Sequence, residues 1–242
     1  MTEELVTREC IILAGGFGTR LRTEVSDRPK CLAAMDEMGT PFLKILIQYL
    51  IGHGFTRLLL SMGYMHEMII DFISDEKFPA VFEFIIETEP LGTGGAIKKA
   101  VQKSLAENVL IVNADTYFDV DIDQLFVAHL EKHPLGTIAL KYMENFDRYG
   151  SLEMNDQKVI TSFNEKKFTE KGLINGGVIL INTKALGSYD LPDKFSFETD
   201  FLKYRVTENQ VRGFVSEGYF IDIGIPEDFK RAKAELAEFY RR

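Results

Sequence analysis

The chain lacks several features that would place it in a specialised class of protein. Its 242 residues include only two cysteines, Cys10 and Cys31. Their number and context indicate no disulfide framework, so we expect two reduced thiols. No apolar run approaches the roughly 18–20 residues that span a membrane. The stretch from Met1 to Glu4 carries acids where a signal peptide would carry bases. We therefore expect a cytoplasmic protein without a membrane partner.

Basic residues are also in deficit. The chain has 28 Lys and Arg against 37 Asp and Glu, a net charge of −9. A nucleic-acid partner is disfavoured, because many phosphate contacts require a basic face. A local cationic pocket in an acidic protein would suit a small anionic ligand, although the acidity could equally serve only solubility. We find no internal repeat, low-complexity segment or linker, and the length fits one large α/β domain or two small ones.

The densest pattern begins after the apolar run from Cys10 to Leu13, which predicts a short buried strand. Glycines and then cations follow this strand: Gly15, Gly16, Gly18, Arg20, Arg22, Arg28 and Lys30. Glycine lets bare backbone N–H groups approach a ligand, and Arg and Lys bind phosphate oxygens. The pattern predicts a polyphosphate site. The alternative is a plain glycine turn with surface charges.

Two familiar glycine loops do not match. A P-loop requires Gly-Lys-Ser/Thr, whereas Arg20 follows Gly18-Thr19 here. A dinucleotide fingerprint starting at Gly16 would need glycine at position 21, which is Leu21.

Strand and helix patterns alternate through the first half of the chain, which predicts parallel strands joined by crossover helices. Strands are expected at 57–61, 81–87, 108–112 and 136–143, and helices at about 41–50, 65–73 and 121–133. Thr40 is the expected cap of the first helix, with Pro41 in its first position, and Asp121 is the expected cap of the third. After about residue 146, short strands and polar turns predict a mixed, partly antiparallel second half.

A second glycine-rich loop runs from Glu87 to Ala96 and opens a helix. Such a loop can bring backbone against a flat ring or a phosphate, or it can be a plain loop with Thr93 as a cap. The strand at 108–112 then ends at Asp115. A carboxylate at that end of a parallel strand projects into the ligand crevice and can hold a divalent cation. The alternative is an Asx turn.

The second half carries four further polar segments. Glu165 and Lys166 are adjacent, so on a regular strand they would point to opposite faces unless the strand ends or bulges there; a surface charge pair is the alternative. Asn175 precedes two glycines and offers amide groups for sugar hydroxyls. The acids of 195–201 are interpreted as the structural first turn of a helix. Asp222 follows an apolar pair before Gly224.

These segments together resemble the sugar-1-phosphate nucleotidyltransferases. The matching stretches are LAGGFGTRL with PK, PLGTGGA, NAD, FNEK, NGG and FIDIGIPED, which span Leu13 to Asp228. The resemblance implies a Rossmann-like α/β fold with a mixed, mainly parallel central sheet flanked by helices. It implies one domain over 1–242, with a nucleotide-binding half at about 8–145 and a sugar-phosphate-binding half at about 146–242. The family has proline after the lysine of its F-x-E-K segment, whereas Lys167 stands here.

The resemblance also implies a set of site residues. Arg20 and Lys30 would be catalytic, and Asp115 and Asp222 would bind Mg²⁺. The nucleotide would contact Leu13, Gly15, Gly16, Gly18, Thr19, Glu89, Leu91 and Gly92. The sugar phosphate would contact Gly150, Glu165, Lys166 and Asn175. No histidine lies in a matching stretch, which fits a reaction whose nucleophile is an already ionised phosphate oxygen.

Residue by residue, these stretches are most similar to the D-glycero-D-manno-heptose 1-phosphate guanylyltransferases. This resemblance implies GTP and that heptose 1-phosphate as substrates. It also implies that the product is used for a bacterial surface polysaccharide. A glucose- or mannose-type enzyme using UTP, dTTP, CTP or GTP is one alternative. A non-catalytic domain that binds nucleotide-sugars for regulation is another. The family often dimerises, so the resemblance is compatible with a homodimer, but the sequence leaves the oligomeric state open.

Overall fold

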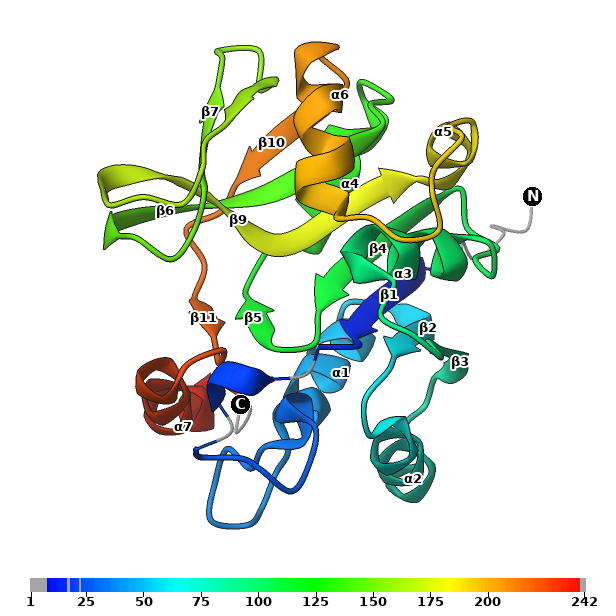
Figure 1. Cartoon of the computed structure of the whole chain (residues 1–242), viewed down its shortest axis with the longest axis vertical. Coiled ribbons are helices and arrows are strands. Elements are labelled where there is room, and N and C mark those ends of the chain that lie inside the picture. The colour runs from blue at the N-terminus through cyan, green and yellow to red at the C-terminus, as the bar shows by residue number, and fades with distance from the viewer. Residues whose placement is uncertain (1–7, 17, 22, 240–242) are drawn as a thin grey trace.

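The computed structural model describes residues 8–16, 18–21 and 23–239. Among these residues a nine-stranded sheet forms the centre of the fold (Figure 1). Its strands are β1 (Arg8–Ala14), β2 (Phe55–Met62), β3 (Val81–Ile86), β4 (Asn108–Asn113), β6 (Gly136–Phe146), β7 (Ser151–Met154), β8 (Ile160–Phe163), β9 (Thr169–Asn182) and β10 (Val211–Val215). A separate two-stranded sheet consists of β5 (Thr116–Phe118) and β11 (Phe220–Asp222).

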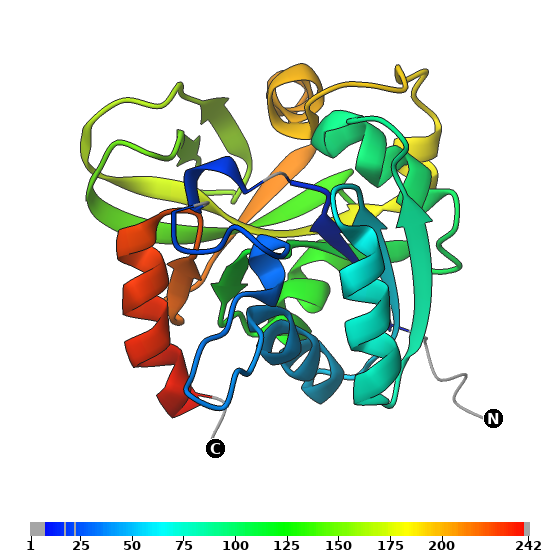
Figure 2. The same cartoon turned by 60° about the horizontal axis from the view of Figure 1, so that its bottom comes forward.

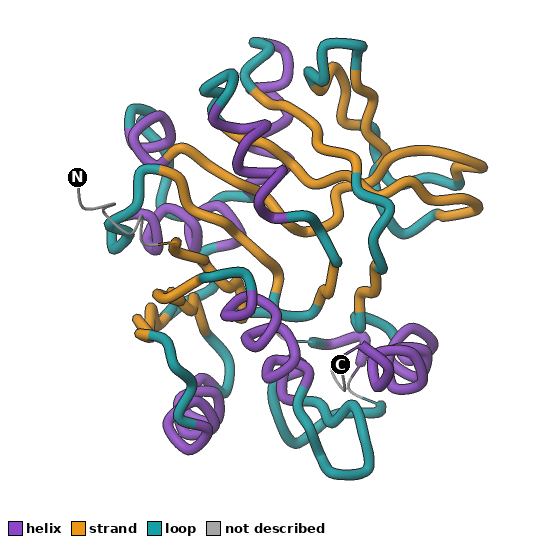
Figure 3. Tube along the Cα trace, turned by 180° about the vertical axis from the view of Figure 1, so that it is seen from behind, coloured by secondary structure: helices purple, strands orange, loops and turns teal. Residues whose placement is uncertain are grey.

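The sheet is mainly parallel, as the alternating pattern predicts. Its order is β10-β6-β9-β4-β1-β2-β3, with β7 and β8 off this path. The pairs β1–β2, β1–β4, β2–β3 and β10–β6 are parallel, whereas β9 is antiparallel to both β4 and β6. Figure 3 shows the β6–β9 and β7–β8 strands projecting from one end of the sheet. The mixed second half is therefore confirmed.

Helices cover both faces of the sheet. They are α1 (Phe42–Gly52), α2 (His66–Glu76), α3 (Gly92–Val101), α4 (Ile122–Leu130), α5 (Thr183–Gly187), the π-helical η3 (Phe197–Leu202), α6 (Lys203–Thr207) and α7 (Pro226–Phe239). The strand β1 shows how the two faces arise, because alternate side chains point to opposite sides. Cys10 and Ile12 pack in one buried cluster with α1, α2 and α4, and Ile11 packs in the other with α3 and η3.

The predicted helix cap at Thr40 is wrong and the one at Asp121 is confirmed, and the alternative of a cap at Thr93 is not observed. The helix α1 begins at Phe42 without a side-chain cap, because the Thr40 hydroxyl instead donates to Asp36 Oδ2 at 2.8 Å. The helix α3 begins at Gly92, and Thr93 Oγ1 accepts a hydrogen bond from another segment. Asp121 does cap α4, accepting from the Gln124 N–H at 3.0 Å. That helix ends at Leu130 and not near residue 133.

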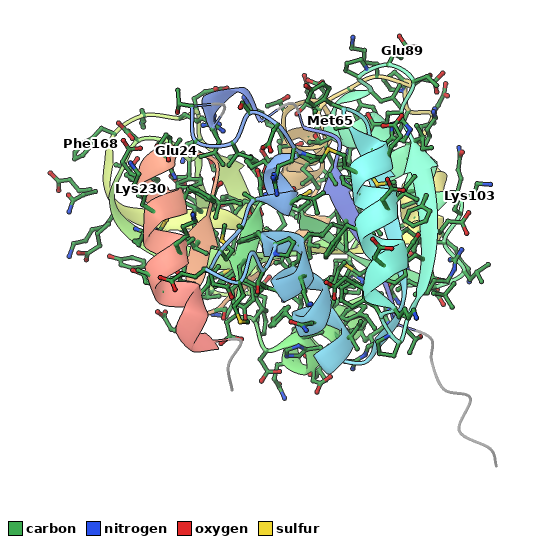
Figure 4. The ribbon with its side chains drawn as sticks, turned by 90° about the horizontal axis from the view of Figure 1, so that it is seen from below. Glu24, Met65, Glu89, Lys103, Phe168 and Lys230 are labelled. Carbon is green, nitrogen blue, oxygen red and sulfur yellow. The ribbon has the colours of Figure 1, made fainter. Side chains whose placement is uncertain are left out.

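The end of the chain returns to the glycine loop. After β11 the chain forms α7, whose buried Phe229 and Leu236 pack in one cluster with Leu21, which ends the short helix η1 (Thr19–Leu21). Figure 2 shows α7 beside this N-terminal segment. Figure 4 shows Lys230 of α7 near Glu24, and their charged groups lie 3.4 Å apart. The division into two halves near residue 145 stays a prediction.

Candidate active site

A hollow of about 380 Å³ opens at the carboxyl ends of β1 and β4, the edge where parallel α/β sheets place their ligands. We call it the first hollow. It is lined by Leu13, Ala14, Gly15, Gly16, Pro29, Lys30, Cys31, Glu87, Pro90, Gly92, Thr93, Ala96, Asn113, Ala114 and Asp115. Most of these residues come from the two glycine loops and the ends of two neighbouring strands.

Glycine is required at two positions of this lining. A Cβ atom on Gly15 would lie 2.8 Å from Glu87 Oε1 and displace that carboxylate. Gly92 has a φ of +70°, and a Cβ atom there would lie 2.5 Å from the Phe195 carbonyl oxygen. At both positions the conformation and the close approach exclude a side chain. Backbone atoms, without a side chain, therefore line the first hollow at Gly15 and Gly92.

A second hollow of about 450 Å³ adjoins the first. Its lining comes from several segments that are far apart in the chain: Arg20, Thr93, Asn113, Asp115, Thr116, Arg148, Tyr149, Gly150, Leu152, Phe163, Asn164, Glu165, Lys166, Asn175, Gly176, Gly177, Glu198, Thr199, Lys203, Phe220 and Asp222. Thr93, Asn113 and Asp115 line both hollows. Asp115 thus stands where two ligands would meet.

Strand pairing brings the second carboxylate to Asp115. In the antiparallel β5–β11 pair, Asp222 lies opposite Thr116, and the Ile223 N–H donates to the Asp115 carbonyl oxygen at 2.9 Å. The Gly224 N–H donates to Asp222 Oδ1 at 2.7 Å and so fixes the carboxylate. The two aspartates are 107 positions apart in sequence, and the fold brings them together as expected.

The charges at this junction are concentrated. Burial, followed by the nearby charge of Asp115, raises the pKa of the Asp222 carboxyl above its usual value. Lys30 forms an ion pair with Asp115 Oδ2 from the side of the first hollow. Lys30 and Arg148 place positive charge beside the two carboxylates, whose oxygens are also suitable ligands for a divalent cation.

Two other cations face the second hollow without a carboxylate partner. Arg20 and Lys166 are both exposed, and neither forms a hydrogen bond or ion pair with the residues that the structure describes. The strand β8 ends at Phe163, so the alternation of a strand no longer separates Glu165 from Lys166. Both side chains line the second hollow, as the strand-end prediction requires.

Comparison with known proteins shows the family of this chain. Residues 9–238 match the family described as Nucleotidyl transferase. The chain belongs to the nucleotidyl transferase family. A D-glycero-alpha-D-manno-heptose 1-phosphate guanylyltransferase of Aneurinibacillus thermoaerophilus is 45% identical over 231 residues, which cover 96% of this chain and 99% of that protein. One of the same name from Campylobacter jejuni is 39% identical, over 91% of this chain and 96% of that protein.

Solved structures agree with the sequence relatives. The crystal structure of HddC from Yersinia pseudotuberculosis superposes with a TM-score of 0.85 at 37% identity, covering 95% of this chain and all of that one. The same protein complexed with GMP-PN superposes with a TM-score of 0.83. The mixed α/β fold and the family membership expected from the sequence are therefore confirmed, and this chain is a nucleotidyltransferase.

Most of the site residues expected of this nucleotidyltransferase line one of the two hollows. Three of those whose side chains the structure describes do not: Gly18, Glu89 and Leu91. Gly18 has a φ of +58° and lies against the Lys30 side chain. Leu91 is buried, and Glu89 is exposed at the outer edge of the molecule (Figure 4). Thr19 opens η1, and its side chain lies outside the described part; Arg22 lies outside it entirely.

Glu87 lines the first hollow and Glu89 does not, and no pattern of neighbouring residues distinguishes the two glutamates in the sequence. The Ser61 hydroxyl donates to Glu87 Oε1 at 3.0 Å, and the Leu91 N–H donates to Oε2 at 3.2 Å. Each carboxylate oxygen can accept a further hydrogen bond. The buried Leu91 thus orients the carboxylate through its backbone, without lining the hollow itself.

The second hollow contains residues that sequence reasoning left out. The sequence pattern favours a structural role for Glu198, yet its carboxylate lines the hollow and accepts from Asn175 Nδ2 at 2.5 Å. Lys203 lies 3.3 Å from Glu165. Both come from the π-helical turn η3 and the start of α6, and π-helical turns frequently occur at functional sites. The available signal was the acidic and basic composition of 198–203, which also fits an exposed helix.

The two aspartates suit a hard divalent cation, which binds carboxylate oxygens. Enzymes of this family generally use a divalent metal ion. Within the described residues there is no group of three or more acidic, histidine or cysteine side chains at one point. The protein would therefore supply two carboxylates, and ligand oxygens or water would complete the coordination.

Other ionisable groups fit this chemistry by staying neutral. Burial, with a contribution from the Asp115 charge, raises the pKa of the Cys31 thiol to about 12, so this thiol in the first hollow is protonated and unreactive. Both Cys10 and Cys31 are free and buried. None of the four histidines lines either hollow.

No described helix has the length and apolar character needed to cross a membrane.

Proposed function

We propose that the chain transfers a guanylyl group from GTP to D-glycero-D-manno-heptose 1-phosphate, giving GDP-heptose and pyrophosphate for a bacterial surface polysaccharide. The two relatives at 45% and 39% identity support the sugar and the base by their names. The HddC structure complexed with GMP-PN, a guanine nucleotide, supports the base as well. A cytoplasmic location and a homodimer stay predictions.

The observation that carries the choice of base is the orientation of Glu87. Guanine presents an N1–H and an N2 amino group side by side, and a carboxylate is an acceptor at both oxygens. Ser61 and Leu91 hold the two oxygens of Glu87 in place at the rim of the first hollow. Uracil, thymine and cytosine lack this pair of adjacent donors. We place guanine here, with Glu89 and Gly92 on the base side of the loop.

The second hollow suits a polyhydroxyl acceptor. Gly150, Glu165 and Asn175 are proposed to contact the sugar hydroxyls, and Glu198 and Lys203 add a carboxylate and an ammonium group to the same wall. A manno-heptose carries one more CHOH unit than mannose in the side chain outside its ring, so it has one more hydroxyl for these groups to bind. Mannose 1-phosphate is the second candidate, because the ring hydroxyls of the two sugars are the same.

The phosphate chemistry requires positioning and charge neutralisation more than proton transfer. A phosphate monoester has a second pKa near ~6, so the attacking oxygen is ionised at neutral pH without a general base. That oxygen forms a bond to the α-phosphorus, and the bond from the α-phosphorus to the bridging oxygen breaks as pyrophosphate leaves. We assign Arg20 to the triphosphate and the transition state, Lys30 to the α-phosphate and Lys166 to the acceptor phosphate. The first glycine loop, Leu13 to Thr19, would hold the triphosphate with backbone N–H groups.

Asp115 and Asp222 are proposed to hold Mg²⁺, which would neutralise the α-phosphate and acceptor oxygens as a Lewis acid. The ion pair between Lys30 and Asp115 lies on the nucleotide side of this pair. Lys30 can therefore reach an α-phosphate beside Asp115.

Pyrophosphate release tests this proposal. The purified chain would receive magnesium, each nucleoside triphosphate in turn, and the 1-phosphates of the manno-heptose, mannose and glucose. We expect release with GTP and the heptose phosphate. Release with another pair would replace the substrates, and no release with any pair while nucleotide binds would favour the regulatory alternative.

A matched pair of variants tests the guanine contact. Glu87→Gln replaces one acceptor by a donor facing the base, and we expect kcat/KM for GTP to fall by about 10–100-fold. Glu89→Gln makes the same chemical change two residues away on the exposed side of the loop and should leave kcat/KM within about twofold. Equal losses in both variants would contradict the proposed role of Glu87.

A further inference from the structure

The Asp222 carboxylate is held by hydrogen bonds from residues that are not among the proposed substrate contacts. Asp222 Oδ1 accepts the Gly224 N–H at 2.7 Å. The other oxygen, Oδ2, accepts the Tyr149 hydroxyl at 3.3 Å. Each oxygen is thus engaged once and keeps a second lone pair for a cation.

Tyr149 is itself held by Arg148. The Arg148 Nη2 group donates to the Tyr149 oxygen at 2.7 Å, and the guanidinium carbon lies 5.3 Å from the centre of the tyrosine ring. The same Nη2 atom lies 2.5 Å from Asp228 Oδ2, in the first turn of α7. The contacts therefore run in one series, from Asp228 through Arg148 and Tyr149 to Asp222.

The direction of the series follows from the chemistry of its members. A guanidinium group only donates, so Tyr149 accepts from Arg148 and its single proton is available for Asp222. At 3.3 Å this last contact is longer than usual for O–H···O. It therefore contributes more to the orientation of the carboxylate than to the stability of the fold.

A second observation points to a role for Arg148 in the site. Its Nη1 atom is buried and has no hydrogen-bond partner among the described residues. Leaving a buried donor unsatisfied is unfavourable, so packing alone does not explain a charged side chain here. Arg148 does place a positive charge near Asp222. This charge offsets the repulsion between the carboxylates of Asp222 and Asp115.

We propose that Arg148 and Tyr149 are positioning residues for Asp222, and that Asp228 anchors them from the first turn of α7. This inference rests on the proposed binding of a metal ion by Asp222. It assigns a function to α7 that the lining of the hollow does not reveal, because Asp228 is not part of that lining. Partners of metal ligands affect metal affinity by about 10–100-fold in known sites.

Manganese binding without nucleotide tests the proposal independently of turnover. Free Mn²⁺ would be followed by electron paramagnetic resonance during titration of the full chain. Tyr149→Phe keeps the ring and removes only the hydroxyl, and we expect the Kd for Mn²⁺ to rise about tenfold. Asp228→Asn, which leaves both carboxylates in place, should raise it several-fold by loosening Arg148.

Tyr219→Phe is the matched control. It also removes a phenolic hydroxyl bonded to another residue, but this hydroxyl donates to Glu235 of α7 at 2.7 Å, whereas that of Tyr149 donates to Asp222. Its Kd for Mn²⁺ should stay within about twofold of the unmodified chain. Thermal unfolding of all variants would show that each is folded before titration.

The outcomes separate this inference from the proposed function. If Asp222→Ala weakens Mn²⁺ binding and Tyr149→Phe does not, the positioning role is wrong while the metal site stands. If Asp222→Ala itself leaves Mn²⁺ binding unchanged, the proposed metal site fails and the positioning role fails with it. Weaker binding in Tyr149→Phe and Asp228→Asn, with Tyr219→Phe unchanged, supports the series of contacts.

Discussion

The two hollows of this nucleotidyltransferase are built in different ways. The first is lined largely by loops that directly follow strands of one parallel sheet, and two of these loops are continuous glycine-rich motifs. The second is assembled from segments that range from Arg20 to Asp222, including a hairpin, a π-helical turn and a strand of the small sheet. Phosphate can be bound by backbone that one local motif supplies, whereas sugar hydroxyls need side chains converging from several directions.

The largest effect is expected at the junction of the two hollows. Asp222→Ala removes one of two carboxylates proposed to hold the metal, and we expect turnover to fall by about 10³-fold or more, because a metal contributes several kcal/mol of charge stabilisation. Steady-state pyrophosphate release at saturating magnesium measures it. The control is Asp119→Ala, an exposed aspartate outside both linings. Near-normal turnover of Asp222→Ala would show that the junction is not the reacting centre.

A smaller effect is expected from Arg20. Arg20→Ala should lower kcat by about 10²-fold with little change in KM, comparable to the loss of one preorganised donor. Arg28→Ala is the matched control from the same loop, because Arg28 is exposed and pairs with Asp27 at 2.8 Å. An increase confined to KM would instead make Arg20 a ground-state ligand.

A still smaller effect, confined to one substrate, would show that the two hollows bind different substrates. Glu198→Gln weakens a charged acceptor in the second hollow only, so the KM for the sugar phosphate should rise about tenfold while the KM for GTP stays constant. Glu208→Gln, on an exposed glutamate after α6, is the control. If the two KM values rise together, the hollows are not separate substrate sites.

A change outside both hollows should affect stability and leave turnover nearly unchanged. His129 is 1% exposed and lies between Thr137 and Asn108, and burial lowers its pKa to about 4. The unfolded chain, with a histidine pKa near about 6.5, binds the proton first as the pH falls. Stability is therefore complete above about pH 6.5 and is lost towards pH 4, by about 3 kcal/mol at most.

Urea unfolding between about pH 7.5 and 4.5 measures this loss. His129→Gln should be less stable than the unmodified chain at neutral pH and should lose less stability with acid. Parallel pH profiles of the unmodified chain and His129→Gln would show that other groups govern the acid transition.

The contrast between the hollows also explains which features the sequence could predict. The strands, most helices and the first glycine loop follow from patterns of neighbouring residues, and their positions are close to those observed. The cap at Thr40 could not be judged locally, because the hydroxyl has a competing partner in Asp36. The choice between Glu87 and Glu89 depended on Ser61, which belongs to another strand.

Sequence alone therefore determined the alternation of strands and helices, the cradle of backbone and cations after β1, and, through resemblance, the nucleotidyltransferase family. Only the tertiary structure decided that Asp222 lies beside Asp115, that Glu198 belongs to a ligand site and that Arg148 links α7 to that site. The physical reason is the distance in sequence between the residues that make each contact. Periodicity and loop geometry arise from residues a few positions apart, whereas these contacts join segments between 23 and 107 positions apart, and strand register and packing bring them together.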